Sequence, residues 1–159
     1  MPYPARILFL ARSLNYGGSE RQLVALAIGL HQEGQSVAVA TFYPGGPFQH
    51  SLESAGVSVS SLGKHSRWGL VGFAWRLIRL VRRVRPKILH GYLGTSNILA
   101  VCLKPFCPGM KVIWGVRASN MELERYGWLD RLLYWIECRL SQCADVIIVN
   151  SHVGLDYAV

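Results

Sequence analysis

The chain has 159 residues, of which 51% are hydrophobic and 16% are charged. This length suits one domain with a substantial core, and the apolar fraction excludes a disordered chain. The formal net charge of +8 indicates an anionic partner, for which a nucleotide phosphate, an anionic lipid and a nucleic acid all qualify on charge alone.

The sequence also disfavours a membrane-spanning protein and a secreted protein. No apolar run reaches the ~18 residues that a membrane span needs, and the run at 7–11 is too short for a signal peptide. We therefore expect a cytoplasmic protein, with a peripheral position on the inner face of the membrane as the alternative. The cysteines come in two pairs with a spacing unlike that of zinc ribbons, so we expect free thiols and no metal: Cys102, Cys107, Cys138 and Cys143.

Short apolar runs alternate with helical patterns along the whole chain. In chain order the expected strands span 6–11, 36–42, 57–62, 87–92, 111–117 and 145–150. The first expected helix begins at Ser19, and a short second one runs through Leu52. Further helices are expected at 70–85, 97–103 and 129–140, with a last one that begins at Ser151. Ser19 could cap its helix while Gln22 reaches back, as in a capping box.

This alternation predicts an α/β fold, a doubly wound parallel sheet of the Rossmann-like kind, with helices on both faces and strand order 3-2-1-4-5-6. We treat residues 1–159 as a single domain of this kind. In such a sheet, ligands bind beyond the carboxyl ends of the strands at the switch point, which here lies between the strands at 6–11 and 87–92.

Three features fall on this edge. Gly17 and Gly18 precede a helix, where a backbone without Cβ atoms can approach a phosphate or sugar; the alternative is an ordinary strand–helix turn. His90 could donate to a sugar hydroxyl or act as a base, or it could be a buried, hydrogen-bonded histidine. Arg117 could pair with a phosphate or carboxylate, or be a surface arginine.

Several common sites are missing from the sequence. There is no G-x-G-x-x-G, and the second strand ends at Thr41-Phe42-Tyr43 without the acidic residue that a dinucleotide site uses. There is also no Walker A sequence and no G-x-S-x-G elbow. These absences argue against NAD binding, P-loop chemistry and a serine hydrolase.

The helix at 70–85 is basic on one side, where Arg76, Arg79 and Arg83 gather. One interpretation is a surface held against anionic lipid, and the other, which the residues favour, is a crossover helix with a solvated basic face. We find no platform of aromatic and basic residues, so we expect no nucleic-acid partner.

The blocks of this chain resemble GT-B glycosyltransferases of family 4. The opening ILFLARSLNYGGSERQLVALAIGLHQEGQSVAVAT carries a G-G-x-E sequence, with Gly17, Gly18 and Glu20 in its fixed positions. The likeness continues, in order, through PFQHSLESAGVSVSSL, PKILHGYLGTSNILA, VIWGVRASN and ADVIIVNS. Together these blocks cover nearly the whole chain.

The resemblance implies retaining transfer of a sugar from a nucleotide-sugar to a glycan or lipid-linked acceptor, without an essential metal or other cofactor. It also implies that this chain is the N-terminal, acceptor-side domain, that the C-terminal donor domain is absent, and that the chain alone is inactive. Gly17 and Gly18 would approach the donor diphosphate, and Glu20 would join the substrate-binding residues.

The same resemblance assigns roles on the fourth and fifth strands. His90 falls in the family's H-x-H region as the candidate catalytic residue, with Tyr92 in place of the second histidine. Tyr92 and Arg117 would contact substrate. Two rivals stay open: a non-catalytic module that docks on a membrane or a partner chain, and an unrelated nucleotide-binding Rossmann-like domain.

Overall fold

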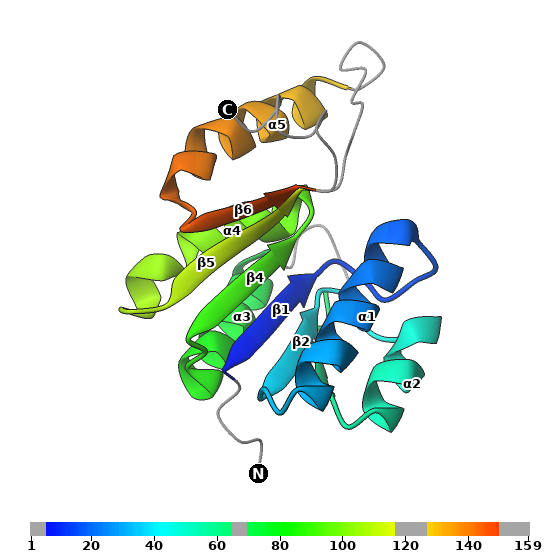
Figure 1. Ribbon diagram of the computed structural model, residues 1–159. Helices are drawn as coiled ribbons and strands as arrows, with labels where there is room; N and C mark the ends of the chain where they lie inside the picture. The colour runs from blue at the N-terminus through cyan, green and yellow to red at the C-terminus, as the bar shows by residue number, and fades with distance from the viewer. Residues whose placement is uncertain (1–5, 65–69, 117–126, 150–159) are drawn as a thin grey trace.

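The computed structural model describes residues 6–64, 70–116 and 127–149 (Figure 1). The strands are β1 (Ile7–Ala11), β2 (Val37–Thr41), β3 (Ser58–Ser61), β4 (Ile88–Tyr92), β5 (Lys111–Val116) and β6 (Val146–Val149). The α-helices are α1 (Gly18–Gln32), α2 (Pro47–Ser54), α3 (Leu70–Val84), α4 (Gly94–Cys102) and α5 (Trp128–Leu140). Short 3-10 turns lie at Lys104–Phe106 and Ser141–Cys143.

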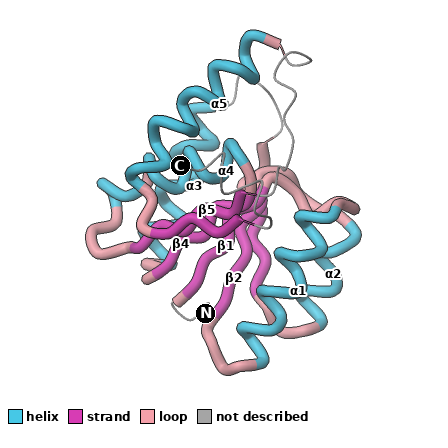
Figure 2. The backbone as a smooth tube through the Cα atoms, turned by 45° about the horizontal axis from the view of Figure 1, so that its top comes forward, coloured by secondary structure: helices cyan, strands magenta, loops and turns pink. Residues whose placement is uncertain are grey.

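The strands form one six-stranded parallel sheet in the order β3-β2-β1-β4-β5-β6. The predicted fold class and strand order are therefore confirmed. Figure 2 shows α1 and α2 on one side of the sheet, with α3 and α4 on the other. Strands covered on both faces need apolar residues at consecutive positions, which explains the continuous run in β1.

Each face of the sheet has its own apolar core. Phe9 points toward α1 and α2, where it joins Leu23 and Leu52. Its neighbours Leu8 and Leu10 point the other way and join the cluster that includes Leu77 of α3. Because side chains alternate along a strand, one sequence run supplies both cores.

Two helix starts differ from the sequence expectation. α1 begins at Gly18 with Gly17 as its N-cap, so the prediction of a Ser19 cap was wrong. α4 begins at Gly94, three positions before the predicted 97, because Leu93 turns the chain directly after β4 with φ 71° and ψ 149°. The helix expected from Ser151 lies outside the described residues.

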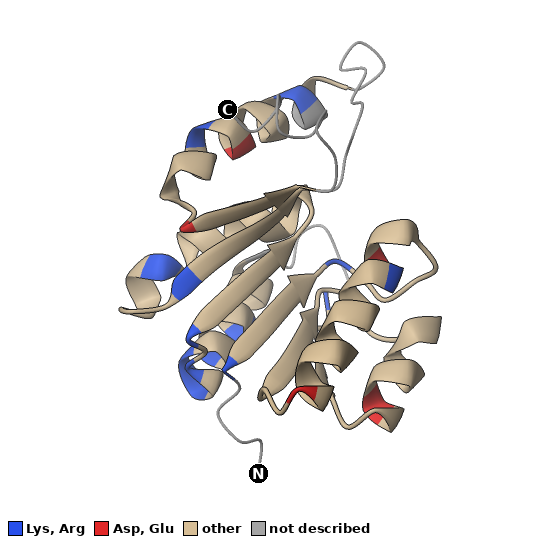
Figure 3. Cartoon of the chain, viewed as in Figure 1, with Lys and Arg blue, Asp and Glu red and all other residues tan. Residues whose placement is uncertain are grey.

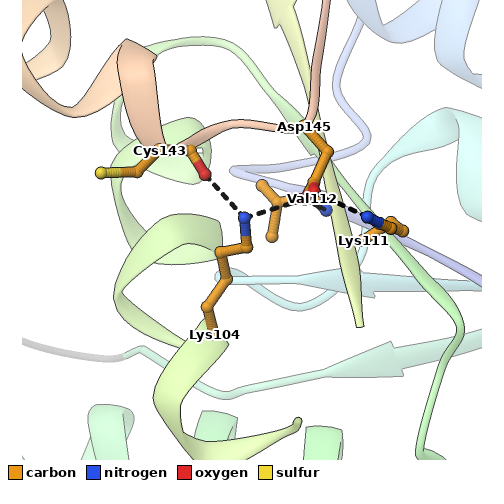
Figure 4. Close-up of polar contacts among 5 residues, drawn as sticks. All are labelled: Lys104, Lys111, Val112, Cys143 and Asp145. Atoms are coloured by element: carbon orange, nitrogen blue, oxygen red, sulfur yellow. Dashed lines mark hydrogen bonds and ion pairs between the residues drawn. The ribbon is translucent and has the colours of Figure 1, made fainter. Parts of the chain in front are cut away.

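An acidic residue fastens the edge strand β6 to β5 (Figure 4). Asp145 Oδ2 accepts hydrogen bonds from the Val112 N–H at 2.8 Å and from Lys104 Nζ at 2.9 Å, and Oδ1 accepts one from Lys111 Nζ at 3.2 Å. Lys104 Nζ also donates to the carbonyl oxygen of Cys143 at 2.8 Å. The Val112 N–H, followed by the two lysines, holds the pKa of Asp145 well below its usual range.

The described residues contain no helix that is both long and apolar enough to cross a bilayer. All four cysteines are free thiols. Within the described ranges, no three side chains of His, Cys, Asp or Glu gather where a metal ion could be held.

Candidate functional site

The carboxyl ends of β1 and β4 lie side by side at the edge where the sequence places the switch point. The two strands pair in parallel from Ile7↔Ile88 to Leu10↔Gly91. The loop that leads from β1 to α1 and the turn that leads from β4 to α4 therefore leave the sheet at the same edge (Figure 1). This juxtaposition joins two segments that are far apart in the sequence.

The N-terminus of α1 lies at this edge and begins with the two glycines. A Cβ on Gly17 would collide with the carboxylate of Glu20, which folds back over the N-cap. A carboxylate in the first helical turn is favourable because the N–H groups there carry partial positive charge. A Cβ on Gly18 would meet no atom of the described residues within 4 Å, so Gly18 borders open space in this part of the structure.

His90 and Tyr92 point to the α1 face of β4 and are both buried, each with 3% of its surface exposed. The His90 ring lies 5.1 Å from the Phe9 ring and 5.3 Å from the Tyr92 ring, measured between centroids. Phe9 and Tyr92 make an edge contact at 6.4 Å. His90 is thus placed in the aromatic layer beneath the rim of the sheet, two positions before β4 ends.

Two glycines make room for this arrangement. A Cβ on Gly115, in β5, would lie 3.3 Å from His90 Nε2 and 3.3 Å from the carbonyl oxygen of Gly91. On the opposite face, a Cβ on Gly91 would lie 2.8 Å from both the Asn97 Oδ1 and the Ser96 carbonyl oxygen. Gly91 therefore allows the first turn of α4 to pack directly on β4.

A buried polar pair supports the start of α4. The side chain of Asn97 is fully buried, and its Nδ2 donates to Glu137 Oε1 of α5 at 3.0 Å and to the Gly115 carbonyl at 3.4 Å. The other carboxylate oxygen of Glu137 lies 3.5 Å from where a Cβ on Gly94 would be. Burial raises the pKa of Glu137, although the Asn97 hydrogen bond acts in the opposite direction.

Sequence reasoning missed this pair because its members are forty positions apart on different helices, and neither position has a local signature. It also missed Leu93, whose positive φ is rare for a residue with a branched side chain. Only the tertiary structure shows that this strained turn starts α4 at the edge of the candidate site.

Basic and aromatic side chains occupy the loops of the same edge. The guanidinium of Arg12, which follows β1, lies 5.9 Å from the Tyr43 ring centroid. Tyr16 is 81% exposed and contacts the Phe48 ring edge-on at 5.5 Å. Arg117, the basic residue proposed from the sequence, lies outside the described residues, whereas Arg12 was not singled out.

Comparisons with known proteins agree with this fold. Residues 17–159 match the family model described as the glycosyl transferase 4-like domain. The chain superposes on HepE from Anabaena, solved in complex with UDP, with a TM-score of 0.77 at 15% identity, covering 96% of this chain and 40% of that one. It also superposes on MurG from Acinetobacter baumannii with a TM-score of 0.58 at 16% identity, covering 93% and 41% of the two chains.

A further solved structure, a glycosyltransferase from Rickettsia africae, gives a TM-score of 0.56 at 13% identity, covering 92% of this chain and 43% of that chain. This chain thus spans about two fifths of the length of these structures. None of the curated proteins matches the sequence.

Proposed function

Because the chain belongs to the glycosyl transferase 4-like domain family, we propose that it is the acceptor-side half of a glycosyltransferase. The enzyme would move a sugar from a nucleotide-sugar to a glycan or lipid-linked acceptor, with retention of configuration. Support for a nucleotide donor comes from the similar fold of HepE, which was solved with UDP. A second domain outside this chain would supply most of the donor contacts.

The observation that carries the proposal is the exposed Gly18 at the start of α1, on the carboxyl edge of β1. Open space beside a helix N-terminus allows the backbone N–H groups to approach an anion such as a diphosphate. The Glu20 carboxylate now lies over Gly17, so a diphosphate would displace it by charge repulsion. Once displaced, this carboxylate could accept a hydrogen bond from a sugar hydroxyl.

In this proposal Tyr92 and His90 act from beneath the edge. His90 is 3% exposed, so the candidate catalytic histidine reaches substrate only if the layer formed with Phe9 and Tyr92 opens. With that layer closed, its ring is a positioning residue that supports the end of β4. Arg117 and Arg12 are the candidate partners for phosphate or carboxylate groups at the rim.

A pair of matched glycine variants tests the site. Gly18 and Gly29 both belong to α1, and a Cβ on either would meet no atom within 4 Å among the residues that the structure describes. We expect Gly18→Ala to weaken binding of UDP several-fold and Gly29→Ala to leave it unchanged, because only Gly18 lies at the proposed ligand edge. Isothermal titration at millimolar UDP measures both. Equal affinities in the two variants would remove Gly18 from the site.

The isolated 159-residue chain should transfer no sugar and should bind nucleotide-sugars weakly. A cleft with one wall neither excludes water nor holds donor and acceptor in a reactive geometry. A radiolabelled sugar-transfer assay on the purified chain measures this. Robust turnover would show that the chain is more than an acceptor-side half.

Docking on a membrane is the second candidate function, and α3 carries the observation in its favour. Val71 and Trp75 are 84% and 61% exposed, and Arg79 lies over the Trp75 ring at 5.9 Å. Arg76 is not part of this surface, because its guanidinium donates to the carbonyl oxygens of Leu62 and Gly63 at 2.6 and 3.1 Å. α3 begins at the edge where β3 ends, so these exposed apolar residues lie toward the candidate site.

Vesicle co-sedimentation tests the docking. Each arginine near an anionic surface contributes about 1 kcal/mol, so Arg79→Glu combined with Arg83→Glu should reduce partitioning by more than tenfold at low salt. Reversal of two exposed arginines on other helices, Arg21 and Arg139, is the control. Equal loss in both variants would mean that net charge alone, and not α3, governs binding.

A further inference from the structure

The edge of the sheet opposite to the candidate site carries a groove of about 670 Å³. It lies between two neighbouring connections, one that leads from α3 into β4 and one that leads from the Lys104–Phe106 turn into β5. The side chains that define its two walls are Arg82, Arg85 and Lys87 on the first, and Phe106, Cys107 and Met110 on the second. This volume is within the range of small-molecule sites.

The first wall is positive and lacks compensating charge. No acidic residue lines the groove in the described part of the chain, and none occurs in the sequence between Glu53 and Glu122. Arg82, Arg85 and Lys87 are exposed, and among the described residues their side chains form no ion pair or hydrogen bond. Figure 3 shows Lys and Arg gathered around the end of α3 and the start of β4.

Arg85 occupies a strained position in this wall. Its φ is 49°, in the left-handed region that glycine adopts more readily, with a cost of roughly 1 kcal/mol for a residue with a Cβ. The strained backbone ends α3 and sets an arginine beside the groove. Cations at the C-terminal end of a helix also interact favourably with the helix dipole.

The second wall is apolar and faces the first. Phe106 is 43% exposed, and Met110 is buried as part of the core. Burial raises the pKa of the Cys107 thiol, while the charges of Arg82 and Arg85 act on it in the opposite direction.

We propose that this groove binds a phosphorylated amphiphile, with the phosphate on the basic wall and the apolar portion against Phe106. Guanidinium groups bind phosphate oxygens in pairs, and an ammonium group adds a point charge. The shared chemistry is a phosphate ester joined to an apolar group, whether in a soluble metabolite or a lipid headgroup. The groove is about 15 Å from the candidate site, the length of a five-residue strand. The proposal for the groove is therefore independent of the proposed transferase function.

Cys107 provides a local readout of occupancy. The chain is alkylated with a thiol reagent at fixed ionic strength, with phenyl phosphate, inorganic pyrophosphate or vesicles of phosphatidic acid in phosphatidylcholine. Peptide mass spectrometry then compares Cys107 with the exposed Cys138. We expect phenyl phosphate to slow labelling of Cys107 at least threefold and to leave Cys138 unchanged. Protection by the vesicles alone would identify a lipid headgroup as the source of the phosphate.

Matched variants separate the groove from general charge. Arg82→Gln with Lys87→Gln removes two cations of the wall, and Arg79→Gln with Arg83→Gln removes two from α3 outside the groove. With phenyl phosphate as the probe, we expect the first pair to weaken protection of Cys107 about tenfold and the second less than twofold. Phe106→Ser should weaken the protection of Cys107 by phenyl phosphate but not the protection by pyrophosphate, because only phenyl phosphate has an apolar group. Equal losses in both charge variants, or no protection of Cys107 by any of the probes, would overturn the proposal.

Discussion

Replacement of Asp145 by alanine should destabilise the domain by about 3 kcal/mol. The largest part arises at the Val112 N–H, which loses its 2.8 Å acceptor; a hydrogen bond to a charged group contributes about 1.5–3 kcal/mol. The two lysine pairs are partly exposed and add only about 0.2–1 kcal/mol each. For a domain of this size, such a loss lowers the Tm by about 6–12 °C.

The contribution of Asp145 also depends on pH. Its pKa in the folded chain lies well below the usual range of an aspartate, so the folded state favours the ionised form. The stabilisation is therefore fully present above about pH 5 and is lost as the pH falls through and below the usual range of aspartate pKa values. The free energy of unfolding of Asp145→Ala should not fall in this way at low pH.

Urea unfolding followed by circular dichroism, from pH 2.5 to 7, measures both effects. Asp145→Asn keeps an acceptor for Val112 and should lose only about 1 kcal/mol. Glu53→Ala serves as the control, because Glu53 accepts a single exposed hydrogen bond from Gln49 within α2. A loss of stability below about 1 kcal/mol for Asp145→Ala at pH 7 would refute the role of Asp145 in holding β6 against β5.

Three further predictions concern the candidate site. Gly91→Ala should lower the free energy of unfolding in urea by about 1–3 kcal/mol, because its Cβ would lie 2.8–2.9 Å from backbone and side-chain atoms of α4. A stability equal to that of Gly29→Ala would contradict this packing. Glu137→Gln should gain stability relative to the parent chain as the pH rises from 4 to 8, since the raised pKa favours the protonated acid in the folded state; parallel pH profiles would contradict it. His90→Phe should keep the aromatic layer and leave UDP affinity unchanged if the histidine is a positioning residue, whereas a several-fold loss at unchanged Tm would indicate direct contact.

The sequence alone determined the fold class. Uninterrupted apolar runs such as 7–11 are typical of strands buried on both faces of a parallel sheet, and the helical patterns between them supply the right-handed crossovers. The strand order followed from the usual topology of such sheets and was confirmed. The glycosyltransferase family was likewise readable from the ordered blocks, and residues 17–159 match its model.

Side-chain environments were decided by the tertiary structure. The sequence places His90 on a strand at the ligand-binding edge, but only the packing of Phe9 and Tyr92 around it shows that the ring is buried. The sequence places Arg76 on a basic helical face, yet its guanidinium donates hydrogen bonds to the carbonyl oxygens of Leu62 and Gly63, which follow β3. The helical period tells which side chains share a face, and it contains no information about which neighbouring carbonyls they meet.

The polar pairs that join distant segments were also beyond sequence reasoning. Asn97 meets Glu137 across two helices, and Asp145 meets Val112 between two strands. Each contact forms because the fold brings together segments 33 to 40 positions apart in the sequence. Local patterns arise from interactions within a turn or a strand, whereas these contacts depend on how the strands and helices are arranged in space, which is why only the tertiary structure reveals them.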